Sequence, residues 1–121
     1  MSPRSLRKSI AEILWKEGGI SRDKRGLNSA LEALKRIKER DLPQASAGTP
    51  KEILEKMEVE NALAVGEMVV RSAILRQESR GAHFRKDFPE TDDQKWKGNI
   101  FLQKSEDGMN LEFRPLDGKI P

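Results

Sequence analysis

Residues 76–93 hold most of the side chains in this sequence whose types and spacing are suited to chemistry. This polar segment contains three arginines, a histidine and two phenylalanines, together with acidic residues and a glycine at position 81. Arginine side chains make bidentate hydrogen bonds to carboxylates, and glycine allows close approach of the backbone. The composition therefore favours a protein interface. A helix C-terminus followed by a loop held by salt bridges explains the same residues equally well.

These residues offer little other chemistry. His83 is the one histidine of the chain, so a role as general base would need help from groups elsewhere. Asp92 and Asp93 are adjacent carboxylates, but without further oxygen ligands they are more typical of a helix N-cap, here before Trp96, than of a metal site. The chain has no cysteine, no Gly-x-Gly-x-x-Gly fingerprint and no Walker loop. We therefore expect no catalytic residue, no metal and no nucleotide site in this chain.

Length and composition limit the class of protein further. A chain of 121 residues fits one domain with a modest core. Its net charge is +3, but acidic and basic residues alternate along the chain, so we expect no nucleic-acid binding. The N-terminus lacks the apolar stretch of a signal peptide, and no apolar run is long enough for a membrane span. We therefore expect no direct membrane insertion.

Three helices must position the polar segment. Apolar residues recur at intervals of three and four between positions 6 and 14 and between positions 27 and 37, which predicts helices over residues 3–17 and 22–40. Thr49 and Glu52 have the spacing of a capping box, with a proline between them at the first helical position. This box predicts a third helix over residues 50–79, in one or two pieces, which ends at Gly81.

The sequence after Pro89 has the pattern of a β-hairpin. Residues 100–102 are apolar, Glu106-Asp107-Gly108 has turn chemistry, and residues 109–114 alternate between apolar and polar. A hairpin over residues 99–114 is marginal by itself in water, so it must pack on the helices or on a partner. The predicted fold is mainly α: a single domain over residues 1–121, with a spectrin-repeat-like bundle of three antiparallel helices and a small C-terminal β-hairpin.

The polar segment also carries a resemblance to a known family. Its pattern Arg-x-Glu-Ser-Arg-Gly-Ala-His-x-Arg-x-Asp-Phe-Pro-x-x-Asp-Asp-x-x-Trp, at residues 76–96, resembles the C-terminal domain of succinate dehydrogenase and fumarate reductase flavoprotein subunits. L-aspartate oxidase is a relative of that family, and the Ala82 and Arg85 positions favour the succinate dehydrogenase and fumarate reductase side. The helical pair at residues 10–34 and the ending at residues 110–115 are also similar, so the resemblance covers nearly the whole chain.

The resemblance implies an excised or separately encoded domain of a flavin-dependent oxidoreductase that acts in electron transport. It implies that FAD belongs to the preceding domains of the parent protein, so no cofactor is expected in this chain, which by itself is predicted to be inactive. The implied partners are the FAD-binding domain of the same flavoprotein and the iron-sulfur subunit. The implied location is the cytoplasm, peripheral to the membrane through partner subunits.

The resemblance also assigns a supporting role to part of the polar segment. None of these residues is expected to be catalytic. They are expected at the contact with the FAD-binding domain, where the two aspartates orient the others. They are Arg76, Glu78, Ser79, Arg80, His83, Arg85, Asp87 and Asp92.

Two other interpretations stay open at this stage. The high isoelectric point and the basic residues near the N-terminus fit a free-standing helical module that binds an acidic partner or nucleic acid, with an affinity that falls steeply with salt. A long third helix that pairs with its own copy would instead make the chain an oligomerisation bundle.

Overall fold

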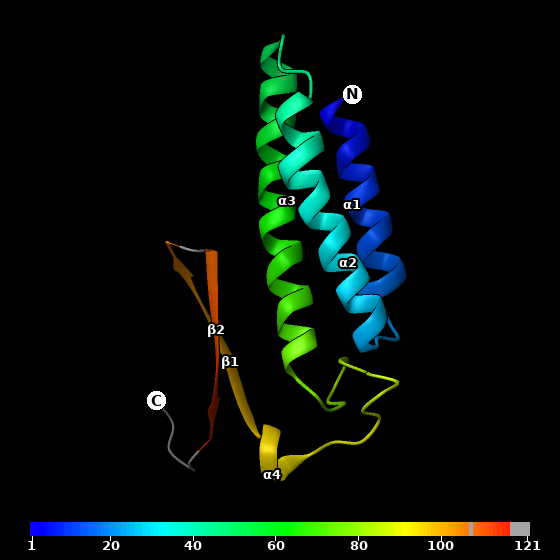
Figure 1. The fold of residues 1–121 in the computed structure, drawn as a ribbon, viewed down its shortest axis with the longest axis vertical. Helices are drawn as coiled ribbons and strands as arrows, with labels where there is room; N and C mark the ends of the chain where they lie inside the picture. The colour runs from blue at the N-terminus through cyan, green and yellow to red at the C-terminus, as the bar shows by residue number, and fades with distance from the viewer. Residues whose placement is uncertain (107, 117–121) are drawn as a thin grey trace.

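The computed structural model describes residues 1–106 and 108–116, and it shows three antiparallel helices with a two-stranded hairpin beside them (Figure 1). The bundle consists of α1 (Pro3–Gly18), α2 (Lys24–Arg36) and α3 (Pro50–Leu75). A short helix, α4 (Asp93–Trp96), leads into the strands β1 (Gly98–Ser105) and β2 (Gly108–Pro115). The predicted mainly α fold, with a three-helix bundle and a C-terminal hairpin, is confirmed.

A side-chain cap fixes the start of each bundle helix. The first backbone amides of a helix lack partners within it, and a short polar side chain at the N-cap can accept a hydrogen bond from one of them. Ser2 accepts from the Ser5 amide in α1, at 3.2 Å, and Asp23 accepts from the Gly26 amide in α2, at 2.7 Å. In α3 the predicted capping residue Thr49 accepts from the Glu52 amide at 3.1 Å.

The core lies where the three helices meet. In α1 and α2 the buried apolar residues follow the spacing of three and four in the sequence, whereas α3 buries one side and leaves other large apolar residues exposed. The buried apolar residues of the three helices are Leu6, Ile10, Leu27, Ala30, Leu34, Val59, Leu63, Val70 and Ala73. Among the described residues, no helix combines the length and the hydropathy that a membrane crossing requires.

The second predicted helix, over residues 22–40, forms with a different end. Its α-helical part stops at Arg36 and continues as a π turn over Ile37–Asp41 and a 3-10 turn over Leu42–Gln44. In an α-helix, residues 37 and 42 would point about 140° apart. The wider π turn, in which the Leu42 amide donates to the Ile37 carbonyl, brings both side chains to the buried side.

The third predicted helix, over residues 50–79, is continuous but ends at Leu75, four residues early. Arg76 is extended, with φ −79° and ψ 99°, so Gly81 is not the helix end that the sequence suggested. Gly81 instead has φ +59° in a tight turn between Arg80 and His83, a conformation that glycine adopts without strain. The chain leaves the helix early because a distant arginine, described below, takes the last carbonyls.

The hairpin gathers most of its large apolar side chains on one face. Its antiparallel register pairs Ile100 with Phe113 and Leu102 with Leu111, so these four side chains share one face. The predicted strand boundaries, residues 99–114, agree with the structure to within one residue, while residue 107 of the predicted turn lies outside the described residues. Figure 1 shows the hairpin alongside the C-terminal half of α3.

The core assignment predicts a large effect of a single truncation. Replacing the fully buried Leu27 with alanine should lower the free energy of unfolding by about 2–5 kcal/mol, because apolar contacts are lost and a cavity forms. Urea titration followed by circular dichroism measures this change. Ile20→Ala, at an exposed position, should shift it by less than about 0.5 kcal/mol. Equal effects of the two substitutions would contradict the assignment.

Candidate functional site

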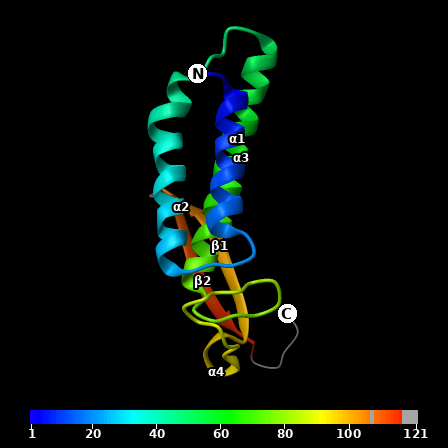
Figure 2. The same ribbon diagram turned by 90° about the vertical axis from the view of Figure 1, so that its right-hand side faces the viewer.

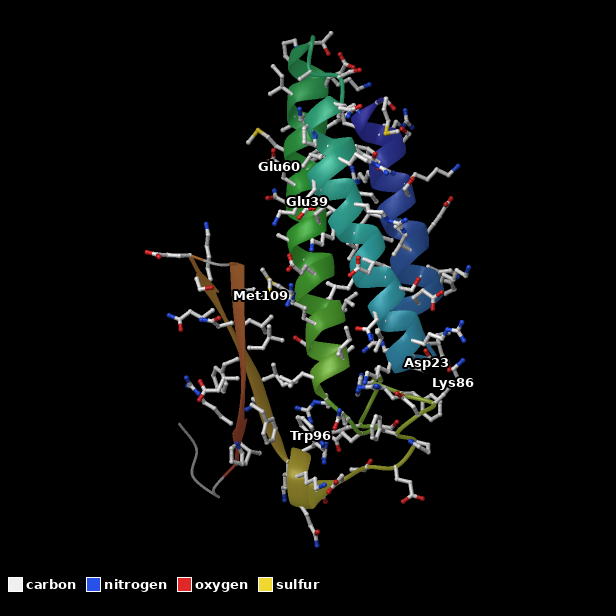
Figure 3. All side chains as sticks on the ribbon, viewed as in Figure 1. Asp23, Glu39, Glu60, Lys86, Trp96 and Met109 are labelled. Atoms are coloured by element: carbon white, nitrogen blue, oxygen red, sulfur yellow. The ribbon has the colours of Figure 1, made fainter. Side chains whose placement is uncertain are left out.

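The polar segment folds beneath the ends of the bundle helices and joins them to the hairpin (Figure 2). It has little regular structure, and its shape depends on hydrogen bonds made by its side chains. A salt bridge of 3.4 Å between Asp23 and Lys86 ties its middle to the start of α2, and Figure 3 shows these two residues side by side.

Glu78 is fully buried, and every partner of its carboxylate comes from the segment itself. Arg76 and Arg80 donate to it from two sides, Arg80 through two nitrogens at 3.0 and 3.1 Å. The backbone amide of Asp92 donates to the same carboxylate at 2.9 Å. Burial by itself would raise the pKa of Glu78, but the hydrogen bonds from Arg80, Asp92 and Arg76 lower it below its ordinary value. The buried group is therefore an ionised carboxylate.

Arg76 connects this carboxylate to the base of the hairpin. Its guanidinium donates to the carbonyl of Trp96 at 2.8 Å and to that of Gly98 at 2.9 Å. It also lies within 6 Å of the rings of Trp96 and Phe113, which pack edge to face at 5.0 Å. One side chain at the end of α3 thus holds α4 and both strands in place.

Arg85 closes the C-terminal end of α3. Its guanidinium is almost completely buried and donates to the carbonyls of Ala73 and Ile74, at 3.2 and 2.8 Å. A positive group at this end of a helix also complements the helix dipole. Asp87 neutralises the guanidinium through two hydrogen bonds, at 3.0 and 2.6 Å, and accepts a third from the Lys24 amide at the start of α2. The pair therefore links α3 to α2.

Ser79 organises the loop that carries Arg85. Its hydroxyl accepts from the Arg85 amide at 2.9 Å and donates to the Phe88 carbonyl at 2.8 Å. Its backbone carbonyl accepts from the Thr91 hydroxyl at 2.6 Å, and its amide donates to the Glu90 carbonyl. Because both ends of the loop meet at this residue, Ser79 fixes the loop through hydrogen bonds to backbone groups and to the Thr91 hydroxyl.

His83 lies between Arg22, in the connection between α1 and α2, and the end of α3. Nε2 is 3.1 Å from the Arg76 carbonyl, and Nδ1 is 2.9 Å from Nη1 of Arg22. A carbonyl only accepts and a guanidinium only donates, so the ring is neutral with its proton on Nε2. Burial lowers the pKa of His83, and the positive charges of Arg22, Arg85 and Arg76 lower it further, against the raising effect of the bond to Arg76.

Asp92 and Asp93, at the end of the polar segment, have different hydrogen-bond partners. The side chain of Asp92 caps α4 by accepting from the Lys95 amide at 3.1 Å, as the N-cap interpretation predicts. Asp93 binds Arg80 at 2.6 Å. Within residues 1–106 and 108–116, no three acidic or histidine side chains cluster in a way that could hold a metal ion.

The structure brings all eight predicted residues into one connected region, and their hydrogen bonds are made within the chain. Glu78 and Arg85 are the most enclosed of them, and each is neutralised by a neighbour two residues away. Two charged side chains that bind them were not predicted: Arg22, which is 61 residues from His83, and Asp93. Asp93 is the second of two adjacent aspartates in the motif, and Arg22 lies within the helical pair that resembles the family, but no sequence signal paired Arg22 with His83. Chemically, the region is a set of ion pairs that join the bundle to the hairpin.

Comparison with known proteins gives concordant matches. The family model described as fumarate reductase flavoprotein C-term matches residues 7–120. One subunit of the CoM/CoB fumarate reductase of Methanothermobacter marburgensis is 37% identical over 106 residues, which is 84% of this chain and 19% of that protein. An L-aspartate oxidase of Pyrococcus horikoshii is 38% identical over 81 residues, 67% of this chain and 13% of that protein.

A solved structure has the same fold. The FrdA chain of a mutant Escherichia coli quinol fumarate reductase superposes with a TM-score of 0.84 at 22% identity, over 96% of this chain and 21% of that chain. The present chain therefore spans about a fifth of the length of the fumarate reductase chains that it matches.

The buried carboxylate predicts a stability effect that volume alone does not explain. Replacing Glu78 with glutamine keeps the shape but leaves Arg76 and Arg80 without their shared counter-charge. It should lower the free energy of unfolding by about 3 kcal/mol. Urea unfolding at neutral pH measures the loss. The control is Glu112→Gln in the exposed pair with Arg114, which should cost less than about 1 kcal/mol. A neutral effect of Glu78→Gln would contradict a structural role for the ion pair.

The neutral histidine predicts a pH dependence. Because the folded chain holds the pKa of His83 below its ordinary value, the unfolded chain binds the proton better. The contribution of His83 to stability is thus fully present above about pH 6.5 and is lost as the pH falls below that value. The free energy of unfolding of the wild type should fall between about pH 7 and 5. His83→Gln should remove most of this fall in parallel urea titrations, and identical pH profiles would contradict the assignment.

Proposed function

The chain belongs to the fumarate reductase flavoprotein C-terminal family, and from this premise we propose that it packs against the flavin-binding part of a fumarate reductase or succinate dehydrogenase type of flavoprotein. The observation that carries the proposal is the extent of the match. The family model covers residues 7–120, whereas the chain accounts for about a fifth of each fumarate reductase relative. A domain of this kind contributes to a larger enzyme and does not perform the reaction alone.

The arrangement of the polar segment supports a structural role in that enzyme. A buried, fully hydrogen-bonded carboxylate has no capacity left to bind a substrate, and a guanidinium that caps a helix is held in the same way. We propose that these residues act as positioning residues, which keep the hairpin at a fixed orientation to the bundle. The flavin-binding part would then dock on a surface that is already formed.

The residues of this chain do not fit a flavin site. Dinucleotide-binding folds place the cofactor at a glycine-rich turn between a parallel strand and a helix. The two strands among the described residues are antiparallel and form a hairpin, and the sequence lacks the glycine fingerprint. In our proposal FAD is bound outside this chain, and no step of its chemistry runs through the residues described.

The proposal extends to partners and location. The M. marburgensis relative is named as a subunit of its enzyme. By analogy, we propose that the flavoprotein carrying this chain also contacts an iron-sulfur subunit. It would then work in electron transport in the cytoplasm, peripheral to the membrane through its partners.

Recovery of the native protein with an antibody against this chain tests the proposed function. We expect the sequence in a yellow polypeptide or tight complex several times heavier than 13.7 kDa, with the visible absorption of a flavin. Mass spectrometry and an absorption spectrum provide both readouts, and assays with succinate, fumarate and aspartate then identify the substrate. A colourless protein of 13.7 kDa, without a flavoprotein bound to it, would overturn the proposal.

A further inference from the structure

The longest helix, α3, is apolar on two opposite sides. One side, which includes Val59, Leu63 and Val70, is buried against α1 and α2. Residues on the other side are large, apolar and exposed: Leu54, Met57, Val65 and Met68. At 3.6 residues per turn these four side chains fall within one stripe of the helix that contains no charged residue. A contiguous exposed apolar surface of this kind is typical of a site that packs against another protein element.

The hairpin extends this apolar stripe into a broader surface. Two hollows, of about 440 and 540 Å³, separate α3 from the hairpin, and residues of both elements line them. Met68 and Leu102 line both hollows. Figure 3 shows Met109 on the side of the hairpin that faces α3, in agreement with its place in the larger hollow. We call this surface, made by Leu54, Met57, Val65, Met68, Ile100 and Leu102, the α3–hairpin face.

The exposed apolar side of the hairpin indicates that it packs against a further element. A two-stranded hairpin is marginally stable in water unless a third strand or another packed element covers its apolar face. Arg76, α4 and Phe113 hold its base, as described above. Farther along, Leu102 remains 38% exposed on the apolar face. The hairpin is therefore fixed in orientation at one end, with its apolar side open.

By comparison, the polar segment at residues 76–93 is a poor candidate for a docking contact. The described residues include no buried side-chain nitrogen or oxygen without a hydrogen-bond partner, and Glu78 and Arg85 are enclosed. A partner that bound there would have to replace bonds already made. The α3–hairpin face would instead exchange water for apolar contact, which is the main favourable contribution to protein association.

We propose that the α3–hairpin face is the surface on which the flavin-binding part of the flavoprotein docks. This inference rests on the proposed function. The relative from M. marburgensis has about four fifths of its length outside the matched region, so a large covalently linked neighbour is available to cover the face. A linked neighbour also has a high effective concentration, which favours it over a second copy of the chain.

Cysteine labelling in the complete flavoprotein tests this inference directly, because the chain has no cysteine of its own. Val65→Cys and Met68→Cys place thiols at positions that are 58% and 41% exposed in the isolated domain. Trp15→Cys, on α1 and 74% exposed, is the matched control. Each native variant is treated with iodoacetamide, and peptide mass spectrometry measures the labelling rate at that position.

We expect the two α3 thiols to react at least about tenfold more slowly than the control in the native protein, because covered sites react only through opening. All three should react at similar rates in urea. Equal native rates at all three positions would overturn the inference. Slow labelling at Trp15→Cys as well would also overturn it, since the protection would not distinguish the α3–hairpin face.

A crosslink identifies what covers the face. A short photoreactive maleimide attached at Val65→Cys should join this chain to a peptide of the flavin-binding part. A crosslink to a second copy, or to another subunit, would overturn the inference while leaving the proposed function intact. If the native protein is not a flavoprotein at all, the proposed function fails first, and the recovery experiment above detects that failure separately.

Discussion

The carboxylate of Glu78 lies buried between two guanidinium groups, and the chain beyond α3 depends on this ion pair for its position. Through Arg76 the same group is connected to the base of the hairpin, and through the Asp92 amide to α4. Burying an ion pair is costly, and replacing it with apolar side chains is often neutral or even stabilising. We interpret the pair as a device for orientation. It sets where the hairpin lies relative to the bundle, which apolar contacts of a marginal hairpin would not define.

A second ion pair, between Arg85 and Asp87, fixes the middle of the polar segment. Arg85 ends α3 by donating to its last carbonyls, and its partner Asp87 accepts from the Lys24 amide at the start of α2. Because α3 ends early, the chain turns and passes beneath the bundle, and the hairpin then returns alongside α3 (Figure 1). The two pairs therefore connect helix termination, loop shape and hairpin orientation in one continuous network.

This division of polar and apolar groups is relevant to function. The most buried charged residues of the sequence motif, Glu78 and Arg85, are neutralised within the chain, while several large apolar residues of α3 and the hairpin are exposed. In our proposal, the motif residues act by fixing the shape of the surface through which the domain meets the rest of the flavoprotein.

Periodicity and local chemistry determined a large part of this structure in the sequence alone. The three helices, the Thr49 cap, the hairpin and the family resemblance all follow from residues that lie close together in the chain, where spacing dictates which face is buried. The end of α3, the π turn after α2 and the Arg22–His83 contact do not follow from spacing. They depend on contacts between distant residues: Arg85 competes for the carbonyls of Ala73 and Ile74, and burial selects the wider turn. Tertiary structure also decided which carboxylates and carbonyls the motif arginines bind, because only folding brings those groups within their reach.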